Sequence, residues 1–106
     1  MIRGAGFGVL ILTGLFLTLA AEAGERAKGE ALAVKFCARC HVIGESNPFG
    51  GIGSSPSFPL MAKYADMFRP RIRTFKERRP HAQFQWEVND RDIEDLLTYI
   101  MSLPVK

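Results

Sequence analysis

The sequence has little of what marks several large protein classes. It contains two cysteines in 106 residues, which excludes a scaffold held by many disulfides. Its net charge of +3 is too small to indicate nucleic-acid binding. No alternating apolar and polar run predicts a β-strand. The charged fraction of 24% and the many Leu, Ile, Phe and Val residues exclude a disordered chain, so we expect one small all-α domain.

The N-terminus lacks the long apolar run of a membrane span and has instead the composition of a secretory signal. One arginine gives a positive start, and an uncharged, mostly apolar run follows at residues 7–21. This run of about 15 residues is shorter than the roughly 20 that a spanning helix needs, so we expect no stable membrane anchor. Small residues predict cleavage after Ala23, with Ala21 as the alternative. The expected organisation is therefore a signal peptide at residues 1–23 and one domain at residues 24–106.

The first half of that domain predicts one helix and one long loop. Good helix formers run from Arg26 to Cys37. Residues 44–59 are rich in Gly, Pro, Ser and Asn, which is typical of a loop. A loop of this length is unusual in so small a domain, and it is easier to explain if it wraps a large ligand.

The second half predicts two further helices. Ser57 is a candidate N-cap for a helix that continues to Phe68, and we expect Pro70 to end it. Asn89 is a candidate N-cap for the last helix. The apolar residues of that helix follow the i, i+3, i+4, i+7 spacing of an amphipathic helix, and they are Ile93, Leu96, Leu97 and Ile100.

The chemistry of the chain is concentrated at residues 37–41, which form the pattern C-x-x-C-H. Two thiols at this spacing, Cys37 and Cys40, can both add to the vinyl groups of one haem, while His41 ligates the iron. A covalent haem would also complete the core of so short a chain. A redox-active C-x-x-C site is the first alternative, although the strand that normally precedes it is missing. Zinc is the second, with His81 as the fourth ligand that it would need.

In these features the chain resembles the small single-haem class I c-type cytochromes of bacteria, over essentially the whole mature domain. The resemblance rests on residues 37–41, on Gly29 in the helix before them, and on the terminal helix at residues 92–103. It implies an all-α cytochrome c fold, with three to four helices wrapped around one covalently bound haem c. It also implies that the first and last helices cross at Gly29, with Tyr99 or Ile100 packed opposite.

The same resemblance implies roles for individual residues. Cys37 and Cys40 would carry the thioether bonds, and His41 would be the proximal ligand of the iron. Pro56, in the Gly-rich loop after the motif, would accept a hydrogen bond from Nδ1 of His41 and so fix the ring.

The sixth position of the iron is where the sequence departs from that family. Members commonly place a Met in the loop before the last helix, and here that loop contains none. His81, in the same loop, is the first candidate for the sixth ligand. Met61 and Met67, on the predicted second helix, are the alternatives. An open site, covered by Phe84 or Trp86, is a further alternative.

The resemblance implies one-electron transfer in the periplasm, by a free carrier or by the cytochrome subunit of an oxidoreductase. No catalytic pair of side chains accompanies the motif, so we do not expect an enzyme. The alternative function is a cytochrome that binds or senses CO, NO or peroxide at an open sixth site. The basic run from Arg69 to Arg79 predicts an acidic redox partner, or arginines that neutralise haem propionates.

Overall fold

All the regular secondary structure in the described part of the protein is helical. The computed structural model describes residues 24–105, so the predicted signal peptide lies outside the described residues. Within this range there is no strand, and no helix is long and apolar enough to cross a membrane. The elements in chain order are α2 (Arg26–Leu32), the π-helix η1 (Ala33–Cys37), α3 (Phe58–Lys63), α4 (Ala65–Arg73), the 3-10 helices η2 (Phe75–Glu77) and η3 (His81–Phe84), and α5 (Asp90–Met101).

Helix α5 is the structural centre of the domain, and its start follows the predicted pattern. The Asn89 side chain accepts a hydrogen bond from the backbone N–H of Asp92 at 2.8 Å, and the Asp92 carboxylate accepts one from the N–H of Asn89 at 3.0 Å. This reciprocal pair satisfies two backbone donors that a helix start otherwise leaves free. The predicted last helix and its cap are confirmed, and the apolar residues that it buries are Ile93, Leu96, Leu97 and Ile100.

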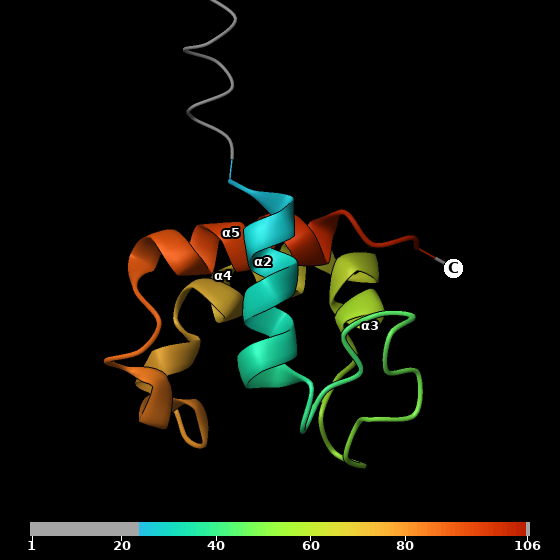
Figure 1. Ribbon diagram of the computed structural model, residues 1–106, viewed down its shortest axis with the longest axis horizontal. Coiled ribbons are helices and arrows are strands. Elements are labelled where there is room, and N and C mark those ends of the chain that lie inside the picture. Colours follow the sequence, from blue (N-terminus) through green and yellow to red (C-terminus); the bar gives the residue numbers. More distant parts are fainter. Residues whose placement is uncertain (1–23, 106) are drawn as a thin grey trace, which may run out of the picture.

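Helices α2 and α5 cross in close contact, as Figure 1 shows. The crossing point is Gly29, where an added Cβ would overlap the backbone carbonyl of Asp95 and lie 2.8 Å from Cβ of Tyr99. Only glycine lets the two backbones approach this closely. The predicted crossing at Gly29, with Tyr99 opposite, is confirmed.

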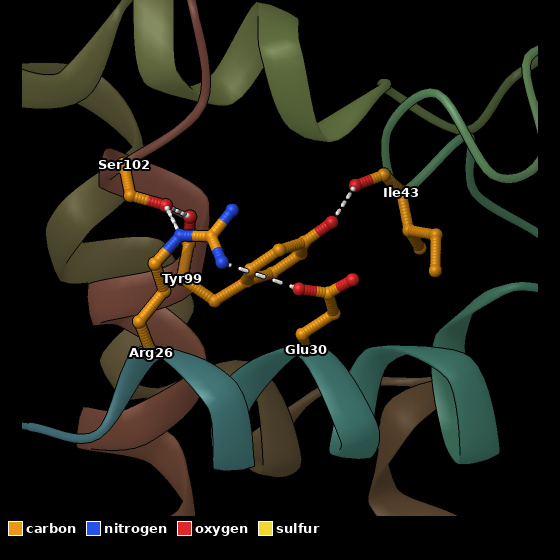
Figure 2. A network of polar contacts seen from close by, with 5 residues as sticks. All are labelled: Arg26, Glu30, Ile43, Tyr99 and Ser102. Carbon is orange, nitrogen blue, oxygen red and sulfur yellow. Dashed lines mark hydrogen bonds and ion pairs between the residues drawn. The ribbon is translucent and has the colours of Figure 1, made fainter.

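A network around Tyr99 joins this crossing to the loop that follows the C-x-x-C-H motif (Figure 2). The Tyr99 hydroxyl donates to the carbonyl of Ile43 at 2.7 Å. The guanidinium of Arg26 lies 5.4 Å from the centre of the Tyr99 ring and donates through Nε to the Ser102 hydroxyl at 2.9 Å. Arg26 also forms an ion pair with Glu30 at 3.3 Å. Because Ile43 is only two residues beyond His41, these contacts help to fix the backbone of the candidate site.

The second predicted helix differs from the structure at two points. Ser57 caps it as expected, accepting a hydrogen bond from the N–H of Leu60 at 3.2 Å. The helix then breaks at Tyr64 into α3 and α4, and Pro70 lies inside α4 instead of ending it. The prediction that the helix ends at Pro70 is therefore wrong. Ile72, two residues after Pro70, is buried in the core. Its burial stabilises the part of α4 that follows Pro70 and offsets the loss of the hydrogen bond that a proline cannot donate.

The first helix reaches Cys37 as predicted, but its last turn widens. The N–H of Ala38 donates to the carbonyl of Ala33 at 3.0 Å, a spacing of five residues, so η1 is a π-helical turn. Such turns are common at functional sites because they change the direction of side chains within a helix. Here Phe36 and Cys37, both within η1, line the main cavity.

The segment between His41 and Ser57 contains no helix, as its composition predicts. Asn47 orders its first turn: the side-chain oxygen accepts from the N–H of Ile43 at 2.8 Å, and the side-chain nitrogen donates to the carbonyl of His41 at 2.8 Å. Figure 1 shows this loop on one side of α2 and the segment that carries η2 and η3 on the other.

Candidate functional site

A cavity of about 470 Å³ lies between η1, the loop after the motif, α3, α4, η3 and α5. This volume is within the range of about 300–1,000 Å³ that is typical of small-molecule and cofactor sites. Most of its walls are apolar and aromatic, and they include Phe36, Phe58, Phe68, Phe75, Phe84 and Leu96. Cys37, Cys40 and His41 line the same cavity, so the chemical motif and the principal apolar hollow coincide.

The two cysteines are free thiols in different surroundings. Burial, together with the neighbouring Cys40, raises the pKa of Cys37 to about 12. Cys40 is exposed, so the cavity reaches the surface at this side of the motif. Redox-active C-x-x-C sites depend on a lowered thiol pKa, and the environment of Cys37 has the opposite effect. The geometry thus favours thiols that face an apolar ligand over a disulfide exchange site.

His41 is buried, with 8% of its surface exposed, and its orientation is fixed. Nδ1 lies 2.7 Å from the carbonyl oxygen of Pro56, which can only accept, so Nδ1 carries the proton and donates. This tautomer leaves Nε2 with a lone pair, the form in which histidine binds metals. The hydrogen bond that the resemblance implies is present, while its effect on an iron ligand stays a prediction.

His81, at the start of η3, also lines the cavity and faces His41. The ring centres are 6.0 Å apart and the ring planes differ by 19°. Phe75 holds the His81 ring from the side, edge to face, with ring centres 5.3 Å apart. Burial lowers the pKa of His81, with smaller effects in the same direction from His41 and Arg78. The lowered pKa favours the neutral form of His81, in which one ring nitrogen keeps a lone pair.

Only some of the other residues considered for the sixth position line the cavity. Met61 is buried and lines the cavity, whereas Met67 is 57% exposed and does not. Phe84 lines the cavity and packs edge to face on Phe36, with ring centres 5.5 Å apart. Trp86 is 90% exposed and is not part of the wall, so of the two residues named as covers of an open site only Phe84 is at the cavity.

The donor set around the motif does not suit zinc. Among residues 24–105, no three or more His, Cys, Asp or Glu side chains gather where they would hold a metal ion. A protein zinc site needs three or four such ligands. Haem iron needs fewer, because the porphyrin supplies four nitrogen ligands and the protein only the axial ones.

Five side chains of the basic run from Arg69 to Arg79 fall into two sets. Arg73 forms an ion pair with Glu94 at 3.0 Å, and the hydrogen bond that its Nε donates to the Glu94 carboxylate raises the pKa of Arg73. Lys76 donates to the carbonyl of Val88, so both side chains are used to attach this segment to α5. The arginines that instead line the cavity are Arg71, Arg78 and Arg79.

Two residues of this site were not identified from the sequence. Phe75 orients His81, and Asn47 holds the turn after His41. The role of Phe75 depends on how η2 packs against η3, for which the sequence has no local pattern. The Asn47 contacts are typical of an Asn side chain in a turn and could have been anticipated from its place in the Gly-rich and Pro-rich loop.

Comparison of the chain with family models, with curated proteins and with solved structures found no match. A function must therefore be inferred from the residues of the cavity and their geometry.

Proposed function

We propose that this protein is an exported electron carrier, a single-haem c-type cytochrome with the corresponding all-α cytochrome fold. The observation that carries the proposal is the convergence of Cys37, Cys40 and an oriented His41 on one apolar cavity of about 470 Å³. Each element of that convergence has a use in haem binding, and no other cofactor requires all of them together.

The residues present fit a haem chemically. Free thiols at Cys37 and Cys40 are the groups that form thioether bonds, and Nε2 of His41 carries the lone pair that would ligate iron. The aromatic and aliphatic walls suit a porphyrin face, and the arginines at the cavity suit its carboxylates. When bound, the group would supply a reversible one-electron change at iron.

The protein would contribute orientation, burial and charge. Pro56 holds the proton of His41 on Nδ1, which raises the basicity of the ligand nitrogen. Phe58, 5.6 Å from His41 between ring centres, keeps water from that side of the imidazole. A dry, apolar surrounding reduces the reorganisation that accompanies a change of charge. None of these features prepares a bond of a substrate for cleavage, which agrees with a carrier.

Two exposed arginines at the edge of the cavity, which we call its rim, indicate what kind of partner the protein would bind. Arg71 and Arg79 are exposed, line the cavity, and form no ion pair within the described residues. A positive rim beside a redox group attracts an acidic partner and raises the encounter rate. An acidic redox protein is therefore the partner that we propose, and electron exchange with it should slow as ionic strength rises.

A potentiometric titration of the exported protein tests the proposed function. The visible spectrum should change reversibly between an oxidised and a reduced form, following a one-electron Nernst curve. The double variant Cys37→Ser/Cys40→Ser should lack covalent haem, while Arg39→Ala, between the two cysteines and exposed, serves as the matched control. A purified wild-type chain without a redox-active haem would contradict the proposal.

A further inference from the structure

The cavity holds two histidines, and they are the only two in the chain. His41 comes from the end of the motif and His81 from η3, so 40 residues separate them along the sequence. The fold nevertheless brings their rings to 6.0 Å between centres with planes only 19° apart. Both rings line the cavity.

We propose that His81 is the second axial ligand of the iron, so that the centre is ligated by two histidines and closed to external ligands. This inference rests on the proposed function, because it presumes that a haem occupies the cavity.

The separation of the rings agrees with one metal ion between them. A metal–imidazole nitrogen bond is about 2.0–2.1 Å, and the ring centre lies roughly 1.1 Å further, so two opposed imidazoles on one ion have centres about 6.3 Å apart. The observed 6.0 Å is close to that value. The two rings are nearly parallel, and no hydrogen bond joins them among the described residues.

His81 is held in this position by its own segment. Phe75 packs edge to face against the ring at 5.3 Å, and the N–H of Ala82 donates to the carbonyl of Arg78 at 3.0 Å, which closes the turn around Pro80. Lys76 attaches the same segment to the carbonyl of Val88, directly before α5. A ligand positioned before the metal arrives loses less conformational entropy when it binds.

The competing thioether ligands are less well placed. Met67 lies outside the cavity wall with 57% of its surface exposed. Met61 does line the cavity, but it packs in the same buried cluster as Phe58, on α3. Phe58 lies beside His41, with ring centres 5.6 Å apart, which places α3 near the proximal histidine.

Two histidine ligands have measurable consequences. An iron with both axial positions filled by imidazole does not take up CO readily, and its reduction potential is lower than that of a His/Met centre, because Met ligation raises the potential. We therefore expect that CO leaves the visible spectrum of the reduced wild type unchanged, and that the reduction potential rises when His81 is lost.

The experiment compares the visible spectrum of reduced holoprotein before and after addition of CO, in the wild type and in His81→Ala. Wild type should show a c-type haem spectrum that CO leaves unchanged, and His81→Ala should bind CO. Added imidazole should restore the wild-type spectrum of His81→Ala, which a purely structural role for His81 would not produce. Met61→Leu tests the thioether alternative and should keep the wild-type response to CO.

The outcomes separate this inference from the proposed function. Absence of covalent haem in the wild type would refute both. A wild type with haem that binds CO as readily as His81→Ala, or a Met61→Leu variant that alone becomes open to CO, would overturn only the assignment of His81. If His81→Ala does not accumulate with haem, His81→Met replaces it: a raised potential supports the inference and an unchanged potential overturns it.

Discussion

The crossing of α2 and α5 and the walls of the cavity are stabilised in different ways. At the crossing the two backbones are in direct contact, with Gly29 against Asp95 and Tyr99. On the cavity side, the same core cluster faces a hollow of about 470 Å³, because residues such as Phe58, Leu96 and Ile100 belong both to the core and to the cavity wall. The polypeptide fills the crossing by itself, whereas on the other side it leaves a cavity, which the proposed haem would fill.

The comparison shows how so short a chain can fold. A domain of about 80 residues has a small core, and many chains of this size use a cofactor or disulfides for additional stability. Here the crossing fixes the position of α5, and α5 presents one apolar face toward the cavity. The proposed haem would then contribute apolar surface that the chain itself lacks.

The largest loss of stability should follow from removing the two cysteines that would attach the proposed haem in the cavity. In Cys37→Ser/Cys40→Ser, the core loses its ligand, and we expect loss of most or all of the folding free energy, about 5 kcal/mol or more. Far-ultraviolet circular dichroism during thermal unfolding measures this, with Arg39→Ala as control. An unchanged unfolding midpoint would show that the crossing alone stabilises the domain.

The next largest effect should come from breaking the crossing. Gly29→Ala adds a Cβ that overlaps the Asp95 carbonyl, so the helices must separate, and we expect a loss of about 1–3 kcal/mol. Gly53→Ala is the matched control, because an added Cβ there meets no atom within 4 Å. Urea unfolding of the two variants gives both values. Equal effects would contradict the close packing at Gly29.

Tyr99→Phe tests the link between the two regions. The Tyr99 hydroxyl donates to the Ile43 carbonyl in a buried position, and its loss should cost about 1 kcal/mol. Tyr64→Phe removes a hydroxyl for which the described residues show no hydrogen bond, so its effect should be close to zero. If urea unfolding does not distinguish the two variants, the Tyr99–Ile43 hydrogen bond does not stabilise the domain.

The smallest loss of stability should come from breaking the exposed ion pair between Arg26 and Glu30, beside the crossing. Glu30→Gln breaks the ion pair with Arg26, which is largely exposed, and should cost less than about 0.5 kcal/mol. The difference from Glu45→Gln, a control without an ion pair in the described residues, should shrink further as salt is added. A larger, salt-independent cost in thermal unfolding would mean that Glu30 supports Tyr99 directly.

Local patterns were enough to predict where two helices begin and which face of the last helix is buried. The cap at Asn89, the apolar spacing of α5 and the cap at Ser57 each depend on residues within a few positions of one another, and the structure confirms them. The crossing at Gly29 came from the family resemblance. Pro70 was misjudged because burial of Ile72, a tertiary effect, outweighed the local preference of proline.

The candidate site could be predicted only in part. The C-x-x-C-H motif identified Cys37, Cys40 and His41, since its spacing is local. The sixth position stayed open between His81, Met61 and Met67, because it depends on how the segment before α5 folds back over the cavity. The π-helical turn at η1 has no sequence signature, so the direction of Cys37 could not be anticipated.

The most direct test of a covalently bound haem is the intact mass of the exported protein after denaturation, recorded together with its visible spectrum. We expect a mass equal to the mature polypeptide plus one haem, and a c-type spectrum that remains with the denatured chain. A mass equal to the polypeptide alone, with no haem absorbance retained, would contradict it.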